Sequence, residues 1–358
     1  MTKPKHTRIH LGTFDLVKGL AILLLVYGHT QNHYQVQAQS VLTPLFLLLR
    51  PLKAGLNPLF FLISGFAFKE KPVKKVLKKT FSELIKPYLW VTGIVAVLFP
   101  TIHYLSFHWL PGALEEGIRV ALPFLFGIPK GGKVLFGYTV YECSVAWFLL
   151  AMFWGLNLAN LLLKVKSLWA QIGCAAAAVV AGFVLLRFDF NYFCIPQGLL
   201  ATGYCYAGYL AKQYDLLSRK KLLPWLYVAL CLVTAAQAIF GEINLPYGIF
   251  KLGLLDYIAS LCAGVLFLLL GILAGNIQWA GLGWLRKIGI YTYWIMCIHS
   301  VELACLPWYL LGSALPQSQG LAMLIELAGK AVILSLGCIV LRRIYKNRYR
   351  RKLSRDRT

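Results

Sequence analysis

The sequence predicts an all-α polytopic membrane protein of about ten transmembrane helices, and three observations lead to this fold class. Hydrophobic residues make up 59% of the 358 residues and charged residues 14%, well below the charged share of soluble proteins. Apolar runs of about 20 residues, the helix length that crosses a bilayer, recur along the chain. The formal net charge of +23 comes from short polar segments between those runs. Together these features exclude a soluble enzyme.

Ten apolar segments are candidate spans. They cover residues 14–30, 45–68, 85–107, 145–163, 168–187, 194–211, 222–240, 254–274, 288–311 and 321–341. Residues 108–144 form a long loop, and its amphipathic stretch from Glu115 to Phe126 is expected in the membrane interface. We therefore expect one integral-membrane domain over residues 1–341.

The basic residues predict the orientation of these spans. Of the 36 Lys and Arg residues, 28 lie in the N-terminal segment, the loops on its side of the membrane and the C-terminal segment. Since positive loops stay inside, both termini are expected to be cytoplasmic. Residues 342–358 form a basic cytoplasmic tail that we expect to bind anionic lipid. Nucleic-acid binding is the weaker alternative, because no motif supports it.

The first span places two ionisable side chains and a histidine on one helix face. Asp15 and Lys18 are three residues apart, a spacing that allows pairing on a helix. Lys18 and His29 are eleven residues apart, which is almost three turns, or about 16 Å along one face. This arrangement suits a long anionic molecule whose reactive end reaches a base across the membrane. The alternative is a snorkelling lysine and an interfacial histidine.

The next three spans carry residues with both structural and functional interpretations. Ser64 in the second span can act as a nucleophile or can bond back to its own helix. The third span begins Lys86-Pro87-Tyr88, which is typical of a basic flank with an aromatic belt. Trp147 opens the fourth span, where belt residues and sugar-stacking platforms look alike in sequence.

The last two spans place acidic side chains near basic ones. His299 and Glu302 are three residues apart, and a carboxylate beside an imidazole raises its basicity and fixes its tautomer. Glu326 and Lys330 are four residues apart, so we expect this ion pair to satisfy itself. Ionisable groups inside a membrane are costly, which makes His299 with Glu302 the second acid–base candidate. No cluster has the tight spacing of metal ligands, so we expect no metal site.

In their order along the chain, several short motifs resemble the membrane acyltransferase 3 family of bacterial O-acyltransferases. They are Asp15…Lys18-x10-His29, Phe60-Phe61-Leu62-Ile63-Ser64-Gly65-Phe66, Pro87-Tyr88, Trp147-Phe148-Leu149, and Gly289-Ile290-Tyr291-Thr292-Tyr293 with His299. The chain looks most like the fucose 4-O-acetylase-type branch. Many members have arginine at the position of Lys18. Lysine keeps the positive charge but lacks the bidentate fork with which arginine binds phosphate.

The resemblance implies a bacterial plasma-membrane enzyme that takes an acyl group, in the first instance acetyl, from a cytoplasmic acyl-CoA such as acetyl-CoA. The acceptor is a hydroxyl of a cell-envelope or exported glycan, or of a lipid-linked sugar. His29 is expected to act as general base, to be acylated, or to activate an enzyme hydroxyl. The remaining site residues that this interpretation assigns are His299 and Glu302 for catalysis, and Lys18, Asp15, Lys86 and Tyr88 for donor binding.

Two other classes fit part of the pattern. A multispan transporter or glycan flippase also has many spans and charges at the midplane, but the chain shows no paired half-chain repeats. A membrane scaffold or sensor does not require the lysine–histidine face.

Overall fold

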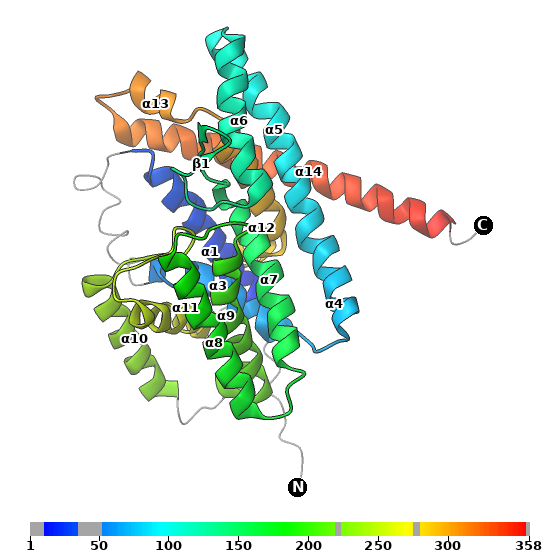
Figure 1. Ribbon diagram of the computed structural model, residues 1–358, viewed down its shortest axis with the longest axis vertical. Helices are drawn as coiled ribbons and strands as arrows, with labels where there is room; N and C mark the ends of the chain where they lie inside the picture. Colours follow the sequence, from blue (N-terminus) through cyan, green and yellow to red (C-terminus); the bar gives the residue numbers. More distant parts are fainter. Residues whose placement is uncertain (1–10, 35–51, 219–222, 275–279, 356–358) are drawn as a thin grey trace.

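The computed structural model describes residues 11–34, 52–218, 223–274 and 280–355, and Figure 1 shows them as a bundle of helices. The predicted all-α class is confirmed. Within the described part, seven helices are long and apolar enough to cross a membrane. They are α1 (Leu11–Gln31), the continuous helix of α4 (Val73–Thr80), a π-helical turn (Phe81–Ile85) and α5 (Lys86–Phe107), then α7 (Trp147–Leu162), α8 (Leu168–Arg187), α11 (Leu254–Ala274), α12 (Ala280–Cys305) and α14 (Gln319–Arg355).

The other three predicted spans are also helical where they are described, but they are shorter or more polar. They are α3 (Leu56–Ala67), α9 (Ile195–Gln213) and α10 (Leu223–Phe240). Only 12 residues form α3, and residues 45–51 of that predicted span lie outside the described residues. The count of ten crossings and the orientation of the termini therefore stay predictions.

Helix α9 can be polar because other helices enclose it. It packs against α3, α7 and α8, and its Gln197 and Thr202 are fully buried. Gln197 donates to the side chain of Asn191 and to the backbone carbonyl of Pro246, and Thr202 donates to the carbonyl of Gly198. Protein groups thus supply acceptors for the Gln197 amide nitrogen and the Thr202 hydroxyl, which lipid could not supply.

Glycines allow the closest helix crossings. A Cβ atom on Gly289 of α12 would lie 1.7 Å from the backbone oxygen of Asp15 in α1, and one on Gly19 would lie 2.0 Å from that of Leu285. The α3–α9 crossing is similar, since a Cβ on Gly65 would lie 1.9 Å from the oxygen of Cys205. Small residues permit such backbone contact between helices. The α1–α12 crossing fixes the distance between the two helices that carry the candidate histidines.

Two elements differ from the sequence prediction. The predicted interfacial stretch is part of a longer helix, α6 (Leu110–Phe126), which packs along α5 (Figure 1). The predicted span 288–311 ends early, because α12 stops at Cys305. Pro307 has no N–H to continue the helix, and the residue before a proline disfavours helical torsion angles.

The remaining elements connect the bundle. Helix α14 continues past the predicted end of its span and projects away from the bundle as far as Arg355 (Figure 1), so the described part of the basic tail is helical. Two short hairpins lie in the connections before α7 and before α11. The connecting elements are β1 (Val134–Leu135), β2 (Tyr138–Thr139), β3 (Ile243–Asn244), β4 (Ile249–Phe250), the 3-10 turns Ser144–Ala146 and Leu216–Ser218, and α13 (Tyr309–Ala314).

Candidate active site

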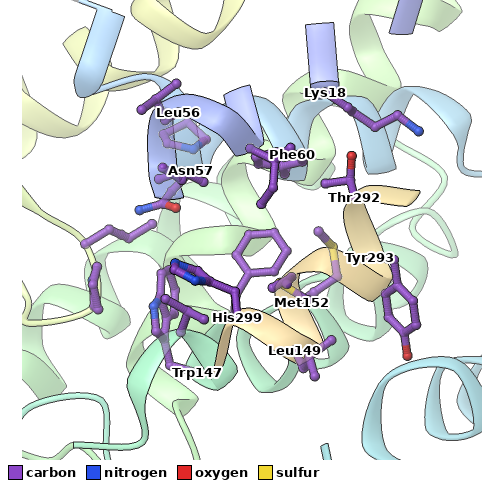
Figure 2. Close-up of a pocket in the computed structure, with 18 of the residues that line it drawn as sticks. Lys18, Leu56, Asn57, Phe60, Trp147, Leu149, Met152, Thr292, Tyr293 and His299 are labelled. Atoms are coloured by element: carbon purple, nitrogen blue, oxygen red, sulfur yellow. The ribbon is translucent and has the colours of Figure 1, made fainter. Parts of the chain in front are cut away.

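A cavity of about 980 Å³ lies among α1, α3, α7 and α12. This volume is in the range of small-molecule sites. Lys18 and His29 line it from α1, His299 lines it from α12, and Trp147 lines it from the start of α7. Figure 2 shows Lys18 on one side of this pocket, with His299 and Trp147 on the other. The prediction that Lys18 and His29 share one helix face is confirmed.

The cavity has two chemically different ends. The end beside Lys18, which we call the Lys18 end, is also lined by Thr80, Ser82 and Glu83. The opposite end is partly lined by the hairpin before α11, and we call it the hairpin end. Its polar lining residues are Asn32, Lys53, Asn57, Glu242 and Asn244. Residue spacing could not predict this group, because its members come from separate segments that only the fold brings together.

The predicted donor residues do not all reach the cavity. Lys18 pairs with Asp15, with 2.8 Å between Nζ and Oδ1, as its spacing predicted. Lys86 is exposed beside Pro87, which lines the cavity, although Lys86 itself does not. Tyr88 is buried, and its hydroxyl donates to the backbone carbonyl of Phe124 at the end of α6. The placement of Tyr88 in the donor site was therefore wrong, because the hydroxyl joins α5 to α6 instead.

A proline explains the irregular wall of the Lys18 end. Pro87 has no N–H, so it cannot donate to the carbonyl of Glu83, four residues earlier in the helix. The Tyr293 hydroxyl of α12 donates to that carbonyl instead, at 2.6 Å. The π-helical turn Phe81–Ile85 stands directly before this proline, and such turns are frequent at functional sites. One side chain of α12 thus fixes the start of α5 beside the cavity.

The two predicted catalytic positions form one site. The ring centroids of His29 and His299 are 5.5 Å apart, with the ring planes inclined by 62°. His299 Nδ1 lies 2.5 Å from Glu302 Oε1, which confirms the predicted contact. The other carboxylate oxygen of Glu302 accepts a hydrogen bond of 2.5 Å from Trp308 Nε1. The sequence had offered His29 and His299 as alternatives, because spacing carries no information about contacts between distant helices.

The pair formed by Glu326 and Lys330 belongs to the same site. Lys330 Nζ is 2.8 Å from Glu326 Oε1, as predicted, and also 3.6 Å from Glu302 Oε1. Glu326 accepts a hydrogen bond of 2.7 Å from the Tyr34 hydroxyl and lies 2.9 Å from His33 Nδ1. The predicted ion pair is thus present, and its further contacts join α14 to the segment after α1 and to α12.

The remaining predictions concern Ser64 and metals. Ser64 lines the cavity from α3, on the same helix as Asn57. Within the described ranges, no group of three or more His, Cys, Asp or Glu side chains is placed to hold a metal ion.

Comparison with known proteins supplies the family. The acyltransferase domain of the acyltransferase 3 family matches residues 11–343, nearly the whole chain. The nodulation protein NolL of Sinorhizobium fredii (strain NBRC 101917 / NGR234) is 26% identical over 247 residues, which is 65% of this chain and 60% of that protein. The chain thus spans less than two thirds of that relative. No solved structure matches. On the family match, the chain belongs to the acyltransferase 3 family of membrane acyltransferases.

Proposed function

We propose that this protein is an O-acyltransferase that moves an acyl group, in the first instance acetyl, from cytoplasmic acyl-CoA to a hydroxyl of a cell-envelope or exported glycan. One observation supports this most strongly. A single cavity joins a cation, Lys18, to an imidazole, His29, that lies about 16 Å further along the same helix. A long donor can therefore place its anionic end at one residue and its thioester at the other.

The charge around the Lys18 end suits the nucleotide part of acyl-CoA. Lys18 lines this end, and Lys86 is exposed nearby. Helix α4, which leads into the cavity wall, adds a group of exposed cations that can attract phosphates before they reach Lys18. These residues are Lys74, Lys75, Lys78 and Lys79.

The proposed chemistry takes place where His29 meets the hairpin end. His29 accepts the proton of the acceptor hydroxyl, whose oxygen attacks the thioester carbonyl. The new C–O bond forms, the C–S bond breaks, and the proton passes from His29 to the departing thiolate. Ser64 also lines the cavity, so an acylated intermediate on the enzyme is the alternative route.

The hairpin end suits a glycan hydroxyl. Asn32, Asn57 and Asn244 offer amide donors and acceptors, and Trp147 offers an aromatic ring, groups that sugars use for orientation. The cavity by itself would also be compatible with a transporter or flippase. The family match over residues 11–343 favours acyl transfer instead.

The proposal is tested with membranes that contain the protein and [14C]acetyl-CoA. We expect release of the CoA thiol and transfer of label to a glycan fraction, and we expect the corresponding O-acetyl groups to be absent from a deletion strain. Unchanged glycan O-acetylation in the deletion strain, together with no CoA release, would contradict the proposal.

Replacement of Lys18 tests the donor site. We expect Lys18→Ala to weaken acetyl-CoA binding about 10- to 100-fold, because a charge-assisted contact to phosphate is worth roughly 1.5–3 kcal/mol. Lys18→Arg keeps the charge and should bind nearly as well as the original protein. Calorimetric titration with acetyl-CoA measures both. Equal affinity in folded Lys18→Ala protein would place the phosphates elsewhere.

Labelling of single cysteines tests the orientation. In a cysteine-free variant, we expect a cysteine at residue 355 to react only after the membrane is opened, and one at residue 125 to react in intact cells. This outcome follows from the positive-inside rule applied to 28 of the 36 basic residues. Labelling of both positions from the same side would contradict the ten-span topology.

A further inference from the structure

We propose that His29, His299 and Glu302 form one proton relay, and that Glu326 and Lys330 set its charge. This inference rests on the proposed acyl transfer, because it assigns a path for the proton that His29 takes from the acceptor. It makes His299 and Glu302 positioning residues that act through His29. It also gives the Glu326–Lys330 pair on α14 a role in the reaction.

Glu302 fixes the tautomer of His299. A carboxylate only accepts hydrogen bonds, so the 2.5 Å contact requires a proton on His299 Nδ1. The opposite nitrogen, Nε2, is then free to accept a proton. That nitrogen is buried and has no hydrogen-bond partner, and the His299 side chain is only 2% exposed. A buried polar atom without a partner is costly, which points to a partner gained during the reaction.

The adjacent His29 ring can supply the missing hydrogen-bond partner of His299 Nε2. Two imidazoles joined by an N–H···N hydrogen bond have nitrogens about 3 Å apart, which places their ring centres roughly 5 Å apart. The observed 5.5 Å between the ring centroids of His29 and His299 is close to that value. A rotation of the His29 ring about its Cβ–Cγ bond, a torsion with broad preferences, can bring a nitrogen to Nε2.

The carboxylate of Glu302 favours a protonated imidazole at His299, which it contacts directly. Glu302, Glu326 and Lys330 are each at most 3% exposed, and two carboxylates with one ammonium leave a net charge of −1. A buried excess charge is expensive unless it is compensated. A proton accepted by the histidine pair supplies that compensation. The cluster therefore stabilises the state that forms when His29 takes the hydroxyl proton, as the carboxylate of a Ser-His-Asp triad does.

Other titratable groups face this relay from the neighbouring segments. His33 and Tyr34 contact Glu326 from the segment after α1, and Lys53 faces His29. His33 is 29% exposed and Lys53 is exposed, so solvent screens charges on these two side chains. Glu302 is shielded from solvent and touches His299 directly. Glu302 and Lys330 are therefore the charged groups next to His299, and Glu326 acts through Lys330, which it contacts.

The relay conserves protons over one turnover. The hydroxyl oxygen forms the C–O bond with the acyl carbon while the C–S bond breaks. The hydroxyl proton moves to His29, and the resulting cation is stabilised through His299 by Glu302. The proton then returns through His29 to the CoA thiolate, so no oxidant, reductant or further reactant is needed.

The test uses charge changes of opposite sign at residues outside the cavity lining. The rate of CoA release from acetyl-CoA, with water as acceptor, is measured between pH 5 and 9 in membranes that contain the full chain. Glu326→Gln removes a negative charge, which destabilises the protonated pair and should move the acid limb of the profile about one unit to lower pH. Lys330→Met removes a positive charge and should move that limb to higher pH.

A double variant and matched controls make the test specific. Glu326→Gln combined with Lys330→Met restores the net charge of −1, so its acid limb should return toward the original position. This variant also keeps the test usable when Lys330→Met alone fails to fold. The controls are Glu115→Gln on α6 and Lys164→Met after α7, which break exposed ion pairs and should leave the limb unchanged.

The possible outcomes separate the relay from the function. Limbs that do not move, or that move in the same direction in both single variants, would overturn the relay while leaving acyl transfer intact. If Lys330→Met folds poorly, the double variant decides the test. An acid limb that stays at the position measured for Glu326→Gln alone would also overturn the relay. Absence of CoA release by the original protein, together with unchanged glycan O-acetylation in the deletion strain, would instead contradict the proposed function.

Discussion

We expect His29→Gln to slow acyl transfer by about 10²–10⁴-fold, the usual contribution of a general base. Glutamine can keep a hydrogen bond, but it cannot accept a proton at neutral pH. Acetyl-CoA should still bind, because Lys18 lies about 16 Å along the helix from His29 and contacts a different part of the donor. Transfer of label from [14C]acetyl-CoA and calorimetric titration measure the two properties separately.

The control for this prediction is His103→Gln on α5, the same change at a histidine that does not line the cavity. It leaves the proposed base and both ends of the cavity in place, so a large loss should be confined to His29. If His29→Gln keeps most of its activity, the imidazole is structural and His299 with Glu302 becomes the leading base. Loss of acetyl-CoA binding would mean that the donor follows another path.

We expect Gly289→Val to prevent stable folding of the bundle. The first carbon of any side chain there would lie 1.7 Å from the backbone oxygen of Asp15, and a backbone atom cannot turn away as a flexible side chain can. Overpacking of a tight interior costs about 1–3 kcal/mol and sometimes more, and this contact belongs at the upper end. The readouts are the thermal midpoint and the monodisperse fraction after detergent extraction.

Gly93→Val is the matched control, because it makes the same change inside a helix where no atom lies within 4 Å of the added carbon. The control should change stability only by the small helix-propensity difference between the two residues, which favours valine over glycine. A thermal midpoint that falls equally in both variants would contradict close α1–α12 contact.

The sequence predicted the helices well because apolar length is a local property. The segment 168–187 was placed at its observed bounds, as was 254–274. Errors arose where a non-local or stereochemical effect decided the outcome. Pro307 ended α12 early, and the amphipathic stretch before the first hairpin packed along α5.

The candidate site was predictable only within single helices. The spacing of Asp15 and Lys18, and of His299 and Glu302, was enough to predict their contacts. The contact between His29 and His299 depends on how α1 and α12 cross, and residue spacing contains no information about that crossing. For the same reason the partners of Lys330 and the position of the Tyr88 hydroxyl were missed.

The buried ion cluster has a consequence for how the enzyme is made. Synthesis proceeds from the N-terminus, so α1 and α12 leave the ribosome before α14, which brings Glu326 and Lys330. Until α14 joins the bundle, Glu302 has no ammonium beside it, and the assembled helices hold an uncompensated carboxylate. Insertion of the final helix therefore places the ammonium of Lys330 beside Glu302 and adds the carboxylate of Glu326, and a chain that stops short of residue 330 lacks that ammonium. The proposed relay therefore has its full set of charged groups only after α14 has been made and has packed against α12.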